Sequence, residues 1–150
     1  MTTLLVVFIA FIVLTGSSSA PGSSQIRQVV HPLVTPTPET GISAQICSAV
    51  MLQPERAITA NHCTRPDTLA IVINDKEYPI LERIANPDRD LAILIIPNAP
   101  CPCATIQVKP IQLDEEVILV GYPEGGGQVL VYGHAQTRVT SDREQLITTA

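Results

Sequence analysis

A histidine that lies next to one cysteine and downstream of another is the part of this sequence best suited to chemistry. His62 follows the short apolar run 57–60 and directly precedes Cys63, while Cys47 lies 16 residues before Cys63 in a second apolar run. A disulfide between these two cysteines would hold the loop that carries His62, and closing a 15-residue loop is worth about 3 kcal/mol. A histidine fixed in this way suits a general base, whose geometry must be set before its pKa matters.

An acidic residue at the start of a later apolar run could complete this arrangement. Asp90 comes 28 residues after His62 and directly precedes the run Leu-Ala-Ile-Leu-Ile-Ile at 91–96. A carboxylate placed there can reach the histidine ring, hold the tautomer in which Nδ1 carries the proton, and stabilise the imidazolium. Asp88 is the alternative for this role, but no apolar run follows it directly, so we favour Asp90.

Four motifs of the sequence resemble those of the trypsin-like serine peptidases, which have the chymotrypsin fold. Thr-Ala-Asn-His-Cys at 59–63 matches the family's Thr-Ala-Ala-His-Cys with one change, and Asp-Leu-Ala-Ile-Leu at 90–94 matches its Asp-(Ile/Leu)-Ala-Leu-Leu. Cys-Ser-Ala-Val at 47–50 is similar to the family's Cys-x-Gly/Ala-x strand. Val-Gly-Tyr-Pro at 120–123 resembles the strand that opens the second barrel, most like bacterial and phage-type members.

The resemblance covers about residues 42–150 and implies an all-β, chymotrypsin-like double antiparallel β-barrel. It also implies that His62 is the general base, that Asp90 orients it, and that Cys47 and Cys63 form a disulfide. The reaction implied is the hydrolysis of peptide bonds in a protein or peptide substrate through an acyl-enzyme, with no cofactor.

The nucleophile of this family has no counterpart in the sequence. The family requires Gly-(Asp/Asn)-Ser-Gly-Gly after the aspartate, which supplies both the attacking Oγ and the N–H groups of the oxyanion hole. The only serine after Asp90 is Ser141, which has no glycine beside it, and the segment 145–150 is similar to the strand that precedes the nucleophile loop. We therefore expect a truncated, inactive fragment whose second barrel is incomplete. The alternative is a non-catalytic secreted binding module that kept the barrel.

The elements that must position these residues are short strands. Apolar, β-branched runs of four to eight residues recur about every ten residues between turn signals, which is typical of an all-β sandwich or barrel. Thirteen prolines oppose a helical bundle. The runs lie at 46–52, 56–60, 69–73, 78–84, 91–96, 106–113, 117–122, 129–132 and 146–149, with a glycine-rich hairpin turn at 125–127.

The N-terminus has the features of an export signal. The first 22 residues carry no charged side chain, and residues 4–14 are an apolar run of secretory length, shorter than the roughly 20 residues of a membrane span. This predicts a signal peptide and a secreted or extracytoplasmic protein without a stable membrane span, with an uncleaved N-terminal anchor as the alternative. The expected organisation is a signal peptide at 1–22, a Pro/Ser/Thr-rich arm at 23–41, a first barrel at 42–110 with the histidine and aspartate, and a partial second barrel at 111–150.

Charge and the remaining histidines limit the other candidate functions. The net charge is −5, and no basic patch is present to neutralise phosphates, so we expect no nucleic-acid partner. His31 and His134 have no partner pattern around them, and we expect both at the surface.

The pairing of Cys101 and Cys103 is left open by their spacing. They could form a local disulfide, pair with cysteines beyond residue 150, or provide half of a zinc site completed by Cys47, Cys63 or His62. Zinc-binding pairs usually have two to four residues between them, and exported proteins tend to oxidise their thiols. We therefore expect disulfide bonding and no metal.

Overall fold

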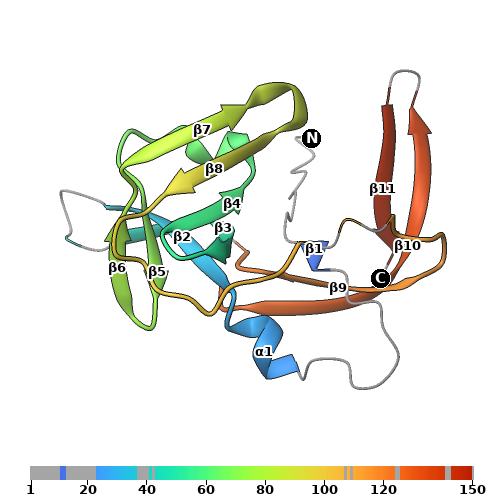
Figure 1. The fold of residues 1–150 in the computed structure, drawn as a ribbon, viewed down its shortest axis with the longest axis horizontal. Helices are drawn as coiled ribbons and strands as arrows, with labels where there is room; N and C mark the ends of the chain where they lie inside the picture. The colour runs from blue at the N-terminus through green and yellow to red at the C-terminus, as the bar shows by residue number, and fades with distance from the viewer. Residues whose placement is uncertain are drawn as a thin grey trace.

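The short apolar runs fold into two antiparallel sheets (Figure 1). The computed structural model describes residues 11–12, 23–36, 41, 43–106, 108, 110–123, 126–140 and 143–149. Within these residues the chain is predominantly β-strand, which confirms the all-β prediction. The helical elements described are short: α1 (Ser23–Arg27), η1 (Asn61–Thr64) and η2 (Pro87–Arg89).

The first sheet has seven strands in the order β6-β5-β2-β3-β4-β8-β7, with every neighbouring pair antiparallel. Hairpins make most of the connections. One of them is the turn at Asn74 and Asp75, two residue types that tolerate the positive φ angles of 51° and 60° found there. The strands are β2 (Val30–Pro36), β3 (Ser43–Gln53), β4 (Arg56–Thr59), β5 (Ala70–Ile73), β6 (Lys76–Pro79), β7 (Glu82–Asn86) and β8 (Leu91–Ile95).

The two residues between β6 and β7 close this sheet into a barrel. The Ile80 N–H donates to the Leu69 carbonyl at 3.0 Å, and the Leu81 N–H donates to the Ile95 carbonyl at 2.9 Å. The chain therefore passes from one edge of the rolled sheet to the other at this point. For that reason the single strand expected over 78–84 is wrong: the segment forms two strands, of which β6 ends at Pro79 and β7 begins at Glu82.

The segment predicted to be an arm belongs to the barrel. Residues 23–41 contain α1 and β2, and β2 lies between β3 and β5 inside the sheet. Leu33 of β2 is fully buried in the core. Pro32 and Pro36 are in register with Ser48 and Ser43 of β3, but both lie outside the short ladder with β5, which pairs Leu33 and Val34 only. The prediction of an arm was based on the proline-rich composition of 23–41 and gave too little weight to the apolar residues of Val30–Pro36.

The second sheet has the order β1-β9-β10-β11 and consists of β1 (Phe11–Ile12), β9 (Glu116–Gly121), β10 (Val129–Thr140) and β11 (Arg143–Thr149). Gly121 pairs with Val129, so β9 and β10 form a hairpin across the glycine-rich segment, of which residues 124–125 lie outside the description. No strand forms among the described residues of 106–113, where a weak one was expected.

The predicted export signal lies outside the described residues except for Phe11 and Ile12, which pair with Leu119 and Ile118 of β9. In the part of the chain that the structure describes, no helix is long and apolar enough to cross a membrane.

Substitution of two leucines tests whether β2 is part of the folded core. Leu33→Ala should lower the free energy of unfolding by about 2–5 kcal/mol, because it removes a fully buried side chain and leaves a cavity. Leu81→Ala is the matched control: Leu81 is 76% exposed, and its truncation should change stability by less than about 0.5 kcal/mol. Urea denaturation of both variants measures the difference, and equal midpoints would contradict the placement of β2.

Candidate active site

His62 lies in a tight turn at the end of β4. Residues Asn61–Thr64 form η1, in which the Cys63 N–H donates to the Ala60 carbonyl at 3.1 Å and the Thr64 hydroxyl donates to the Asn61 carbonyl at 2.8 Å. The last residue of β4, Thr59, is fully buried and donates its hydroxyl to the Ser48 carbonyl at 2.7 Å. These bonds fix the turn from its own backbone and from β3.

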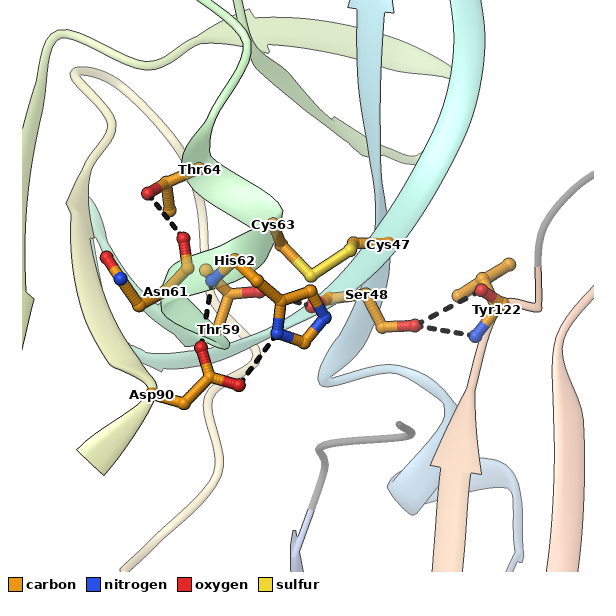
Figure 2. Close-up of a disulfide and its surroundings, with 9 residues drawn as sticks. All are labelled: Cys47, Ser48, Thr59, Asn61, His62, Cys63, Thr64, Asp90 and Tyr122. Carbon is orange, nitrogen blue, oxygen red and sulfur yellow. Dashed lines mark hydrogen bonds and ion pairs between the residues drawn. A yellow bond between two sulfur atoms is a disulfide. The ribbon is translucent and has the colours of Figure 1, made fainter. Parts of the chain in front are cut away.

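A disulfide joins this turn to β3. Cys47 lies in β3 and Cys63 in η1, with their Cα atoms 5.9 Å apart (Figure 2). This is the pairing that the family resemblance implies. Because Cys63 directly follows His62, the bond restrains the backbone next to the histidine.

Asp90 reaches the histidine through an unusual backbone conformation. It follows η2, where the Asn86 side chain accepts a hydrogen bond from the Arg89 N–H at 3.2 Å. Asp90 itself has a left-handed conformation, with φ 51° and ψ 44°, which aspartate tolerates better than most residues do. Its carbonyl accepts the Asn61 N–H at 3.1 Å, so the backbones of the two loops are in direct contact.

The Asp90 carboxylate contacts His62 with both of its oxygens (Figure 2). Oδ1 accepts the His62 backbone N–H at 2.9 Å, and Oδ2 lies 2.7 Å from His62 Nδ1. A carboxylate can only accept, so Nδ1 carries the proton and Nε2 of the neutral ring keeps its lone pair. The two side chains are 37% and 44% exposed, so the pair is open to solvent.

The environment of Asp90 favours its ionised form. Partial burial by itself raises the pKa of Asp90, but the hydrogen bonds from the side chain and backbone of His62 outweigh that effect. Electrostatic interactions with His62 and Arg65 add to the lowering. The pKa of Asp90 therefore lies below its ordinary value, and the carboxylate is charged at neutral pH.

The alternative carboxylate, Asp88, lies exposed in η2, and the carboxylate that contacts His62 belongs to Asp90. Cys101 and Cys103 form a disulfide with each other, which is the local pairing left open by the sequence. Ser141 lies outside the described residues.

His134 is exposed as expected, but the expectation for His31 is wrong. His31 lies in β2 and is buried, and no hydrogen-bond partner reaches its Nε2. Burial lowers the pKa of His31, although its hydrogen bond to the Gln28 backbone acts in the opposite direction. The error follows from the arm assignment, because a histidine in a central strand is surrounded by its neighbours.

Sequence reasoning missed the role of Ser48. Its hydroxyl oxygen accepts the Tyr122 N–H at 2.7 Å and lies 3.5 Å from the Tyr122 carbonyl, so the side chain joins β3 to the end of β9. Figure 2 shows the hydroxyl directed to Tyr122 and away from His62. Among the residues described with their side chains, no hydroxyl forms a hydrogen bond with the His62 ring. The sequence feature that could have indicated this role is the position of Ser48 directly after Cys47.

Comparison with known proteins agrees with this geometry. The family model described as "Trypsin-like peptidase domain" matches residues 47–150, so the chain belongs to that family. Two curated relatives are "Serine protease MT3772" and "Serine protease Rv3671c", from two strains of Mycobacterium tuberculosis. Each is 27% identical over 77 residues, which are 51% of this chain and 19% of the relative. The matched region thus spans about a fifth of those proteins.

Solved structures show the same fold. The crystal structure of the Rv3671c protease from M. tuberculosis in its active form matches with a TM-score of 0.68 at 19% identity, over 97% of this chain and 70% of that chain. The inactive form gives a TM-score of 0.63 at 18% identity, over 80% and 59% of the two chains. The chain therefore has the trypsin-like fold, with a first barrel and an incomplete second one.

Replacing Asp90 should remove the short hydrogen bond in which the Nδ1 proton of His62 lies. In wild-type protein the Nδ1 proton should resonate far downfield in the NMR spectrum, because it lies in a short hydrogen bond to an ionised carboxylate. Asp90→Asn should remove this resonance, and the neighbouring Asp88→Asn should retain it. A downfield resonance that survives Asp90→Asn would contradict the assigned contact.

The buried His31 should make stability depend on pH. As the pH falls below the ordinary histidine pKa of 6.5, the unfolded chain binds a proton that the folded chain does not, so the free energy of unfolding falls. His31→Asn keeps a side-chain N–H for the Gln28 carbonyl but cannot titrate. Between pH 7.5 and 5 it should lose less stability than wild type does in denaturant titrations. The exposed control His134→Asn should retain the wild-type loss; equal losses in all three proteins would contradict the prediction.

Proposed function

We propose that this chain is the part of a trypsin-like serine endopeptidase that provides the general base, His62, and its orienting carboxylate, Asp90. The observation that carries the proposal is the 2.7 Å contact between His62 Nδ1 and Asp90 Oδ2 in a chain of this family. The lowered pKa of Asp90 supports it, because an orienting carboxylate has to stay ionised.

In the proposed mechanism Asp90 holds the proton of the neutral ring on Nδ1 and leaves the Nε2 lone pair available. Nε2 takes the proton of a serine Oγ as that oxygen attacks the substrate carbonyl, and the imidazolium is stabilised by the carboxylate. His62 then gives the proton to the leaving amine, and an acyl-enzyme remains. Water, deprotonated by the same nitrogen, releases the acyl group.

The nucleophile and the oxyanion hole have to come from a Gly-(Asp/Asn)-Ser-Gly-Gly segment, which these 150 residues do not contain. We therefore propose that the 150-residue chain by itself does not hydrolyse peptide bonds. Protein or peptide is the proposed substrate class of any longer protein in which that segment follows.

A second candidate function is a non-catalytic binding module. The specific observation in its favour is that Ser141, the only serine after Asp90, has no glycine on either side. Reading the coding sequence past codon 150 separates the two. A Gly-x-Ser-Gly-Gly within about ten codons supports the peptidase, and a stop codon followed by unrelated sequence supports the binding module.

We also propose an extracytoplasmic location. All four cysteines are in disulfides, Cys47 with Cys63 and Cys101 with Cys103, and disulfides persist mainly in oxidising compartments. The apolar N-terminal run at 4–14 supports the same location.

A fluorophosphonate probe, which labels activated serines, tests the proposal directly. The 150-residue chain should remain unlabelled, and stoichiometric labelling would overturn the assignment of the missing nucleophile. If the coding sequence continues into the nucleophile motif, the longer protein should be labelled. There Asp90→Asn should slow peptide hydrolysis by about 10⁴-fold, while Asp88→Asn should leave it near wild type.

A further inference from the structure

Two sulfur atoms and a histidine nitrogen lie together beside the His62–Asp90 pair. Cys47, His62 and Cys63 each offer one ligand atom, and these atoms lie within 4.8 Å of one another. We propose that reduction of the Cys47–Cys63 disulfide creates a Zn²⁺ site formed by the two thiolates and His62. The metal site stands on its own geometry; only its effect on catalysis rests on the proposed function.

The spacing of the three donors suits a tetrahedral zinc ion. Zn–S bonds of about 2.3 Å and Zn–N bonds of about 2.0–2.1 Å place the sulfurs about 3.8 Å apart and each sulfur about 3.6 Å from the nitrogen. These separations lie inside the 4.8 Å that the three ligand atoms now span. Reduction lets the two sulfurs move apart from bonding distance toward the separation of about 3.8 Å that a tetrahedral zinc ion requires.

Asp90 prepares His62 to bind a metal through Nε2. Its Oδ2 accepts the Nδ1 proton at 2.7 Å and its Oδ1 accepts the His62 backbone N–H at 2.9 Å, so the ring and its tautomer are both held. Zinc-binding histidines nearly always donate their other ring N–H to a carboxylate or carbonyl in this way. The contact that suits a general base thus also suits a zinc ligand.

The backbone around the donors has supports besides the disulfide. Asn61 donates its N–H to the Asp90 carbonyl at 3.1 Å, and Thr59 donates its hydroxyl to the Ser48 carbonyl at 2.7 Å. The turn therefore remains tied to β8 and to β3 after reduction. Cys63 is buried and Cys47 is half-buried, so a reductant would attack the sulfur of Cys47.

The chemistry balances with a small dithiol as the reductant. The dithiol gives two electrons and two protons to the Cys47–Cys63 bond, forms its own disulfide, and leaves two protein thiols. Zn²⁺ then displaces the two thiol protons and accepts the Nε2 lone pair of the neutral ring, which gives a site of zero net charge. Water takes the fourth position. With Nε2 bound to zinc, His62 cannot accept a proton from a serine, so the intact disulfide protects the general base from the metal.

Cobalt titration tests the site without any assay of activity. Cys101 and Cys103 are first replaced by serine in the full chain, so that Cys47 and Cys63 are the only thiols. After reduction with dithiothreitol and its removal without air, one equivalent of Co²⁺ should give a thiolate charge-transfer band and the visible bands of tetrahedral cobalt. Zn²⁺ should remove both. The oxidised protein should give neither, and a reduced protein without these bands would overturn the proposal.

Variants in this background identify the ligands. Cys47→Ser should lower the intensity of the charge-transfer band and weaken metal binding, and His62→Ala should remove the tetrahedral visible bands or weaken metal binding strongly. His134→Ala, at an exposed histidine outside the cluster, should bind as the parent does. Asp90→Asn should weaken binding by about 10- to 100-fold. Unchanged affinity in both His62→Ala and Asp90→Asn would overturn the role of His62.

If reduction of the disulfide partly unfolds the protein, circular dichroism can still test the proposal. A β-sheet spectrum that is lost on reduction and returns with one equivalent of Zn²⁺ supports the site, while a loss that zinc does not reverse overturns it. The result is separable from the proposed function, because metal binding needs no nucleophile. Failure of fluorophosphonate labelling in a longer protein would leave the cobalt spectrum unchanged.

Discussion

The double contact between Asp90 and His62 is the constraint on which the rest of this site depends. One carboxylate holds the ring at Nδ1 and the backbone N–H of the same residue, so the position and the tautomer of the ring are set together. This is achieved by a left-handed residue directly before β8 and a tight turn directly after β4, two strands that are neighbours in the barrel. Adjacent strands thus bring together two residues far apart in sequence.

Strand β3 connects the turn that carries His62 to the second sheet. Cys47 binds η1 through the disulfide, and the next residue, Ser48, binds the backbone of Tyr122 at the end of β9. On the same strand, the Gln45 side chain donates to the carbonyls of Pro123 at 2.6 Å and Gly126 at 2.8 Å, in the hairpin that links β9 and β10. β3 therefore links the first barrel to the second sheet next to the histidine, and Gln128 adds a second link by donating to the carbonyls of Arg27 and Val30.

The residues of the candidate site could be identified from the sequence because each stands in a short local motif. His62 and Cys63 are adjacent, and Asp90 directly precedes an apolar strand, so local order alone marks them. The alternation of short apolar runs likewise predicted the all-β class. Prediction failed where composition and tertiary context disagree. β2 is rich in proline, yet its apolar residues fill the barrel core, and His31 was expected at the surface because β2 was assigned to an arm.

The sequence by itself determined the family, the strand-rich fold and the residue types able to form a base and its orienting acid. These features depend on residues that are close together in the sequence, so they can be recognised without knowing which distant residues come together in the folded protein. Only the tertiary structure decided which carboxylate contacts His62, which cysteines pair, and that β2 completes the barrel. Asp88 and Asp90 are two residues apart, and four cysteines allow three complete pairings. A choice among such alternatives requires distances across the sheet, and those exist only once the barrel has closed.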